Sequence, residues 1–546
     1  MKKKLLPALI VTGLIILVVI IMGITALINK YTPTKKTEDL KEYFNISSDD
    51  EAALIVDNEL SDYKAKIIDK KIYVDYKFVH DSLNSRFYWD ANENVLLYTT
   101  ASDIISAAAD SNSYSVTKQT NDFGYPIVKA TSDSALIALD YVKQYSNITF
   151  KSYDDPARIV ITSKWDEIDS ATVSKSTQVR VKGGIKSPIL KEVKKDDKIT
   201  ILDSGDKWDK IATEDGVIGY IKGKALSESK KTKLTNPDYE EETFTHIKKD
   251  KDICLSWNQV TSQSANSKVP QVISSTKGIN VMSPTWFYLN DNNGNLADIA
   301  SKDYVSYCHS QGIEVWGLFS NLENTDVDAA YVLTHTSTRT TLINQIMSAA
   351  FNYELDGVNI DFENITEAAY GDSYIEFIRE LAIKCHNNGI SLSVDVTVPA
   401  SFNKFFNRSD MAKFADYIVI MGYDEHYKGS DAGSVSSIPW VTEGVESTLK
   451  EVPADQIILG MPFYTRIWEL TPKEDDDAAA ALDEESGQNY AEWSASNKLY
   501  KVWLEDSTSL EKRLKLVDDN KLAGAAFWKL GFENSSVWDT VIKYLD

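Results

Sequence analysis

The sequence is poor in cysteine and histidine. Its 546 residues include three Cys and six His. Cys254, Cys308 and Cys385 are an odd number of widely spaced residues, which argues against a disulfide framework. Each lies in an apolar or helical context, so we expect small buried hydrophobic residues. Neither HExxH nor Cys and His at metal-ligand spacing occurs. The sequence therefore predicts no metal site and no cofactor.

Basic residues are also in short supply. The chain has 58 Lys and Arg against 81 Asp and Glu, which gives a formal net charge of -23. A nucleic-acid-binding surface needs clustered Lys and Arg to neutralise phosphates. We therefore exclude a nucleic-acid partner and expect a neutral polymer or a basic partner.

Length and composition indicate several globular domains. Hydrophobic residues make up 43% of the chain and charged residues 25%, so a large buried core can form. At about 100 to 200 residues per domain, the length favours three or four domains.

The longest hydrophobic run lies at the N-terminus. Residues 2–4 are lysines, and an uncharged, mostly apolar run follows from Leu5 to Ile28. A membrane-spanning helix needs about 20 apolar residues, whereas the apolar part of a cleaved signal peptide has about 7 to 15. The lysines predict a cytoplasmic N-terminus and an extracellular remainder. We predict a single-pass protein of the cell membrane, anchored by residues 1–30; a long signal peptide is the alternative.

Residues 31–250 predict two small domains between a stalk and a linker. Residues 31–54 are polar, with Pro33 after the apolar run, and form the expected stalk. Residues 55–165 combine short β-rich runs with one helical stretch, typical of a small α+β domain. Residues 171–227 contain five short strand-like runs, which suit a small all-β barrel. Residues 228–250 are charged and Lys-rich and read as a linker.

Both small domains resemble known families. Ile72-Tyr73-Val74 followed by Phe87-Tyr88-Trp89-Asp90 resembles the stalk-like domain named after the copper amine oxidase N-terminus, which implies neither copper nor oxidation. The order of Val179-Arg180, Asp197 to Leu202, Gly205 to Ile211 and Gly219-Tyr220-Ile221 resembles a bacterial SH3-like domain. That resemblance implies the cell wall as a partner. Trp208 could face a ligand or belong to the core.

Residues 251–546 predict a (β/α)₈ barrel. Apolar strand-like runs alternate there with helical patterns, as in parallel strands covered by helices. Such barrels carry their catalytic groups at the C-terminal strand ends. The eight expected strands lie near 253–257, 279–286, 313–319, 357–363, 391–398, 417–423, 456–462 and 523–530.

The fourth expected strand has two chemically opposite faces. Side chains alternate along a strand, so Asn359, Asp361 and Glu363 should point into the barrel, and the apolar residues between them should face the helices. Two carboxylates at i and i+2 repel each other, which raises one pKa and favours a protonated Glu that can act as a general acid. A structural ion-pair cluster is the alternative.

The same segment, from Asp356 to Glu363, resembles the DxxDxDxE signature of glycoside hydrolase family 18, with Asn359 in the middle position. Three further segments are similar to those of the family on strands six, seven and eight: Met421-Gly422-Tyr423-Asp424, Gly460-Met461-Pro462-Phe463-Tyr464 and Phe527-Trp528-Lys529-Leu530. A combination of three segments is similar to the subgroup that contains spore-cortex-lytic N-acetylglucosaminidases: Ser283-Pro284-Thr285-Trp286-Phe287, Met421-Gly422-Tyr423-Asp424-Glu425-His426 and Trp503-Leu504-Glu505-Asp506. The resemblance covers residues 252–546.

The resemblance implies a substrate-assisted, retaining glycosidase. Glu363 would protonate the glycosidic oxygen while the 2-acetamido oxygen of the substrate attacks the anomeric carbon. Asp361 would orient the acetamide and stabilise the oxazolinium ion, and Tyr423 would hydrogen-bond the acetamide oxygen. The expected substrate-binding residues are Asn359, Asp424, Met421, Trp528, Tyr464 and Trp286, with Trp528 either under the sugar or in barrel packing.

The chain departs from the family pattern in three places. Asn359 removes a buried carboxylate that could exchange a proton with Asp361, although its amide should still donate a hydrogen bond to Asp361. Val315 to Ser320 lacks the Ser-x-Gly-Gly of strand three. The acidic stretch at 474–485 stands in place of a large insertion domain, so we expect a solvated loop and an open groove.

We therefore predict hydrolysis of β-1,4-linked N-acetylglucosamine polymers. Peptidoglycan is preferred because a membrane anchor and an SH3-like domain would hold the barrel at the wall, and chitin is the second candidate. The alternative is a non-catalytic carbohydrate-binding protein that uses a degenerate barrel.

Overall fold

The computed structural model describes residues 2–365, 370–470 and 479–545. The chain divides into two compact units. The first consists of residues 1–85 and 126–241, and the second of residues 86–125 and 242–546. Each unit is thus assembled from two separate stretches of sequence.

The chain begins with the long helix α1, Lys2–Tyr31. Its segment Leu9–Tyr31 is long and apolar enough to cross a membrane by length and composition, which are properties that a signal sequence shares. The predicted apolar helix is confirmed. Its role as an uncleaved anchor stays a prediction.

The first unit contains two seven-stranded sheets. One has the order β11-β12-β1-β2-β3-β10-β9. Three short helices belong to the same unit: α2 (Leu40–Tyr43), α3 (Tyr76–Ser82) and α4 (Leu139–Tyr145). The strands are β1 (Glu51–Val56), β2 (Glu59–Ile68), β3 (Lys71–Asp75), β9 (Val128–Ala130), β10 (Ala135–Ala138), β11 (Thr149–Tyr153) and β12 (Arg158–Thr162).

The second sheet has the order β15-β14-β18-β17-β16-β13-β19. All five strands expected in residues 171–227 are present: β14 (Thr177–Arg180), β15 (Ile189–Val193), β16 (Lys198–Asp203), β17 (Trp208–Thr213) and β18 (Ile218–Lys222). The structure adds β13 (Glu167–Thr172) and β19 (Lys230–Lys233), which pair with each other. The predicted linker at 228–250 therefore begins with a strand, because β19 finds a partner outside the expected domain.

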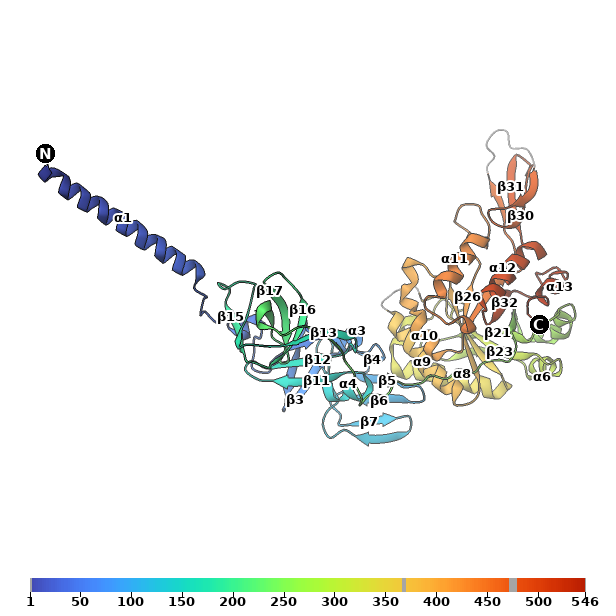
Figure 1. Ribbon diagram of the computed structural model, residues 1–546. Coiled ribbons are helices and arrows are strands. Elements are labelled where there is room, and N and C mark those ends of the chain that lie inside the picture. Colours follow the sequence, from blue (N-terminus) through green and yellow to red (C-terminus); the bar gives the residue numbers. More distant parts are fainter. Residues whose placement is uncertain (1, 366–369, 471–478, 546) are drawn as a thin grey trace. The chain divides into compact units, whose positions relative to one another are not determined.

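The second unit is built on a closed barrel of eight parallel strands, as predicted (Figure 1). The order β20-β32-β27-β26-β25-β24-β23-β21 closes through pairing of β20 with β21, and the short β22 (Leu296–Asp298) runs antiparallel to β21. The barrel strands are β20 (Ile253–Asn258), β21 (Val281–Leu289), β23 (Glu314–Ser320), β24 (Gly357–Asp361), β25 (Ser391–Thr397), β26 (Tyr417–Met421), β27 (Ile457–Pro462) and β32 (Gly524–Trp528).

Apolar side chains pack on both faces of the barrel strands. Inside, Trp257, Trp316 and Tyr417 belong to a compact cluster that fills the barrel. Outside, a larger core lies between the strands and the helices. The helices are α5 (Val269–Ile273), α6 (Lys302–Ser310), α7 (Ala329–Thr334), α8 (Thr336–Tyr353), α9 (Gly371–His386), α10 (Arg408–Phe414), α11 (Ile438–Thr448), α12 (Ser507–Asn520) and α13 (Val537–Val541).

A small five-stranded sheet from the N-terminal half also belongs to the second unit. Asp90 of this sheet accepts two hydrogen bonds from Thr336 at the start of α8, and Tyr88 hydrogen-bonds Ser373 of α9 at 2.9 Å. Residues 55–165 thus contribute to both units, and the domain boundaries given above stay a prediction. The strands are β4 (Phe87–Asp90), β5 (Val95–Thr99), β6 (Ile104–Ala108), β7 (Ser113–Val116) and β8 (Gln119–Asp122).

A second small sheet is inserted between β27 and α12. It has the order β28-β31-β30-β29 and is antiparallel. The expectation of a solvated loop at 474–485 is wrong for residues 479–483, which form β29 paired with β30, while residues 474–478 lie outside the described residues. The other strands are β28 (Ile467–Leu470), β30 (Gln488–Ala495) and β31 (Lys498–Leu504).

Candidate active site

Polar side chains gather at the C-terminal ends of the barrel strands. On β24 the predicted alternation is present, because Ile360 and Phe362 are buried and Phe362 stacks on Phe377 of α9 at 5.5 Å. Asp361 is 8% exposed, whereas Glu363, two residues further on, is exposed at the barrel mouth. The strand end therefore presents one buried and one accessible carboxyl group.

Glu363 has the properties of a proton donor. Protein atoms around its carboxyl group displace water, and this loss of hydration raises its pKa, with further contributions from the negative charges of Asp424 and Glu323. A raised pKa keeps a larger fraction of Glu363 protonated near neutral pH, which a general acid requires.

Asp361 lies deeper and among other acids. Burial is the largest cause that raises its pKa well above the usual range, and the charges of Asp395, Glu363 and Glu323 add to the effect. Among the described residues, its Oδ1 atom has no hydrogen-bond partner. Asp361 is therefore a crowded carboxyl group with an unused acceptor.

Asn359 lies inside the barrel and is fully buried. Its Oδ1 accepts hydrogen bonds from Trp257 Nε1 at 2.9 Å and from Ser283 Oγ at 3.0 Å. Its Nδ2 donates to Ser393 Oγ at 3.0 Å and to Asp395 Oδ1 at 2.7 Å. Both amide donors are thereby used, so the expected bond to Asp361 is replaced by one to Asp395. Asn359 on β24 is thus bonded to residues of three other strands. Because its side chain has no exposed surface, it is not positioned to contact a substrate.

Tyr423 and Asp424 follow β26. Burial, followed by the charges of Asp361 and Asp395, raises the pKa of Tyr423 well above its usual value, so its hydroxyl stays protonated and can donate a hydrogen bond. Asp424 Oδ1 accepts hydrogen bonds from Tyr464 Oη at 2.5 Å and from Arg466 Nη2 at 2.6 Å. The segments after β26 and β27 are thus joined through one carboxylate beside Glu363.

Trp528 ends β32 and is half-buried. Its ring meets that of Trp257 edge-on at 5.8 Å, and Trp257 meets Tyr423 edge-on at 6.4 Å. Trp528 therefore caps the inner cluster and keeps part of its surface accessible. Met421, in contrast, is buried.

The assignment of Trp286 to substrate binding is wrong. Its side chain is 0% exposed and belongs to the core between strands and helices. Its Nε1 donates to Asn266 Oδ1 at 2.7 Å, and its ring packs edge-on against Tyr304 at 4.8 Å. The register of β21 against β23 shifts between Thr285 and Phe287, and both Trp286 and Phe287 belong to the outer core.

Two acidic residues of this region were not among the site residues expected from the sequence. Glu323 lies in the segment after β23 and was not distinguished from other loop acids. Asp395 lies in Ser391-Leu392-Ser393-Val394-Asp395-Val396-Thr397, where polar and apolar residues alternate as on β24. That alternation is the signal that could have placed Asp395 inside the barrel.

Exposed apolar side chains surround the same end of the barrel. They occur in the segments that follow five of the eight strands, where polar residues would be expected on a surface without a binding role. Phe402, the most exposed, is 79% accessible. The five are Leu322, Phe402, Tyr427, Ile467 and Phe532.

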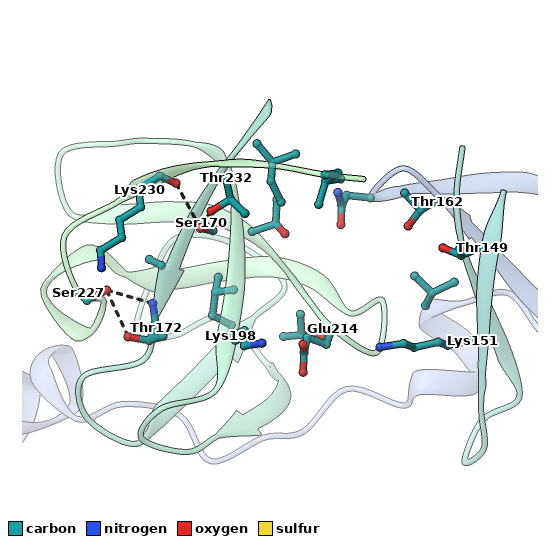
Figure 2. A pocket seen from close by; sticks show the side chains of 18 of the residues that line it. Thr149, Lys151, Thr162, Ser170, Thr172, Lys198, Glu214, Ser227, Lys230 and Thr232 are labelled. Carbon is teal, nitrogen blue, oxygen red and sulfur yellow. Dashed lines mark hydrogen bonds between the residues drawn. The ribbon is translucent and has the colours of Figure 1, made fainter. Parts of the chain in front are cut away.

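The first unit contains a separate cavity of about 520 Å³ between its two sheets (Figure 2). Thr149, Lys151 and Thr162 line one side, and Ser170 and Lys198 belong to the other. Residues 167–233 carry 15 Lys and Arg against 11 Asp and Glu, in a chain whose net charge is -23. This hydroxyl-rich cavity thus lies beside the basic part of an acidic protein.

Part of the barrel is similar in sequence to known proteins. Residues 319–533 match the family model of Glycosyl hydrolases family 18. The chain is 24% identical over 283 residues to the uncharacterized glycosylase YvbX of Bacillus subtilis, an alignment that covers 46% of this chain and 81% of that protein. It is 25% identical over 274 residues to the cortical fragment-lytic enzyme of Bacillus subtilis, with 45% and 63% covered.

Proposed function

We propose that the chain, whose residues 319–533 match the family model of Glycosyl hydrolases family 18, cleaves β-1,4-linked N-acetylglucosamine polymers by a retaining, substrate-assisted reaction. The observation that carries the proposal is the pair of carboxyl groups on β24. Asp361 is buried and Glu363 is accessible, and the pKa of each is raised by burial and by neighbouring acids.

In the proposed reaction the Glu363 carboxyl group donates its proton to the glycosidic oxygen as the bond to the anomeric carbon breaks. The acetamide oxygen of the same sugar forms a new bond to that carbon and gives an oxazolinium ion. Asp361 faces the developing positive charge, and the Tyr423 hydroxyl donates to the acetamide oxygen. Water then attacks the anomeric carbon, the bond from that carbon to the acetamide oxygen breaks, and the attacking water gives its proton to the Glu363 carboxylate.

Trp528 and the residues after β26 complete the proposed site. The accessible face of Trp528 would contact the sugar at the cleavage position. Asp424 holds Tyr464 and Arg466 and keeps a negative charge near Glu363. The exposed apolar residues on the surrounding loops would contact further sugars of a polymer.

Peptidoglycan is the substrate that we favour. An apolar helix at the N-terminus and a basic SH3-like module next to a hydroxyl-rich cavity support a protein that is held between the membrane and an anionic wall. The name of the cortical fragment-lytic enzyme also supports a wall polymer. Chitin is the second candidate.

Replacing Glu363 tests the proposal. In the detergent-solubilised full chain, Glu363→Gln should lower kcat on an N-acetylglucosamine oligomer by about 10² to 10⁴-fold, because the proton donor is lost, and leave binding intact. Glu446→Gln, on the exposed face of α11, is the matched control and should retain turnover.

Two outcomes would contradict the proposal. Undiminished turnover by Glu363→Gln would remove Glu363 from the reaction. Equal cleavage of polymers stripped of their acetyl groups would remove the acetamide from it. Binding without turnover by the wild-type chain, on both purified cell wall and chitin, would favour the alternative of a non-catalytic binding protein.

A further inference from the structure

The buried carboxyl group of Asp395 has no part in the reaction described above. It lies on β25 inside the barrel, is 3% exposed and accepts a hydrogen bond from Asn359 Nδ2 at 2.7 Å. A buried carboxyl group is costly, because its charged form loses hydration, unless a partner compensates. Its position next to Asp361 suggests why this cost is tolerated.

Strand pairing sets Asp395 beside Asp361. β24 and β25 are parallel, with Asn359 opposite Ser393 and Ile360 opposite Val394. The next pair in this register is Asp361 and Asp395, both on the inner face of strands that lie about 4.8 Å apart. Two carboxylates on the same face of neighbouring strands in a buried site cannot both ionise freely.

We propose that Asp361 and Asp395 together hold one proton and one negative charge, and that Asp395 is the positioning residue that determines which of the two carboxyl groups is ionised. The proposal rests on the proposed function, because it assigns a charge state to Asp361 in that reaction. Asp395, on β25, thus provides Asp361 with a neighbouring carboxyl group, which the amide of Asn359 on β24 does not provide.

The hydrogen bonds favour one distribution in the free protein. The amide of Asn359 donates to Asp395 and stabilises its ionised form, whereas Oδ1 of Asp361 lacks a partner among the described residues. The proton therefore resides on Asp361 at rest. When positive charge develops on the substrate, the proton passes from Asp361 to Asp395 and leaves Asp361 negative. The net charge of the pair is unchanged.

The surroundings of the pair keep this proton in the barrel. The carboxyl groups of Glu363 and Glu323 lie near Asp361, and Tyr423, in the segment after β26, and Tyr374, on α9, lie near both aspartates. The pKa of Asp395 is raised well above its usual range, by burial first and then by the charge of Glu363, while its hydrogen bond from Asn359 acts in the opposite direction. Among the described residues, the charged groups that act on the pKa of the two aspartates are all acidic.

The test compares Asp395→Asn with Ser391→Ala in the full chain. Asp395→Asn keeps the shape of the side chain and removes its charge. It should lower kcat about 10- to 100-fold with little change in KM, because Asp361 is left without a proton acceptor, and should change the pH profile of kcat. Ser391 lies on the inner face of the same strand, buried at its other end, and should have no such effect.

The double variant Asn359→Asp, Asp395→Asn returns the carboxyl group to β24. Partial recovery of kcat would support the proposal, since a merely structural role for Asp395 would not be rescued from another strand. An unchanged pH profile in Asp395→Asn, or a loss of kcat that only follows a lower melting temperature, would overturn it.

A readout without turnover separates this proposal from the proposed function. The pH dependence of the unfolding midpoint gives the number of protons that the folded state binds relative to the unfolded state. This number should be larger by one in Glu363→Gln than in the double variant Glu363→Gln, Asp395→Asn. If this proton is present but wild-type protein cleaves no N-acetylglucosamine polymer, the function is wrong and the pair stands. If the proton is absent, the pair is wrong.

Discussion

One buried carboxylate of the small sheet β4–β8 should contribute to the stability of the barrel. Asp90 is 1% exposed, and its Oδ2 accepts hydrogen bonds from the backbone N–H of Thr336 at 2.7 Å and from its hydroxyl at 2.6 Å. Its Oδ1 accepts from the backbone N–H groups of Asn92 and Glu93. Thr336 is the first residue of α8, and the preceding His335 provides no side-chain cap. Asp90 thus caps α8 from a distant part of the chain.

The size of the effect follows from these contacts. Loss of an N-cap costs about 0.5–2 kcal/mol, and a buried donor left without an acceptor costs about 1–3 kcal/mol. We therefore expect Asp90→Ala to lower the free energy of unfolding of the second unit by about 2–4 kcal/mol. Asp90→Asn keeps one acceptor oxygen for Thr336, but its NH2 group cannot accept the bonds from Asn92 and Glu93, so an intermediate loss of about 1–2 kcal/mol is expected.

Urea unfolding followed by tryptophan fluorescence measures this loss, because Trp257, Trp286, Trp316 and Trp538 are buried in the second unit. Lys118→Ala, at the exposed far turn of the same sheet, is the control. If Asp90→Ala destabilised the protein no more than Lys118→Ala, the reasoning that makes β4–β8 part of the barrel unit would be refuted.

Two further predictions concern the reaction. Burial and nearby acids raise the pKa of Glu363, and the acid must be protonated to act, so kcat/KM should fall as the pH rises through that pKa. Asp424→Asn removes one of the negative charges and should move this decline to lower pH in a pH–rate profile. A decline at the same pH in the variant would contradict the assignment of Glu363. Phe402→Ala removes the most exposed of the aromatic side chains around the barrel mouth and should raise KM for a polymer about 2- to 10-fold. KM for a short chromogenic substrate should stay unchanged, and an equal rise for both substrates would contradict a role in binding distant sugars.

Several features of the site could be predicted because they depend on neighbours in sequence. Alternation along β24 places Asp361 at the inner face, and the apolar residues between the polar ones are buried against the helices. The eight barrel strands agree with the structure within a few residues, since buried parallel strands leave continuous apolar runs. The apolar helix at the N-terminus has the same origin, in a run that is readable without knowing any contact.

Other features depend on which strand lies beside which, and a local pattern does not contain that information. The sequence determined that Asn359 faces inward, but only the pairing of β24 with β25 decided that its amide binds Asp395. The same holds for Trp286. The sequence shows the motif that contains it, but only the local path of β21 decided that its side chain lies in the core and not at the barrel mouth. Likewise, strands that read as one N-terminal domain divide between two units, because Asp90 finds its partner more than two hundred residues away. Local periodicity fixes the face of a strand, whereas long-range packing selects the neighbour, and in this protein the neighbours determine the charge state of the proposed site.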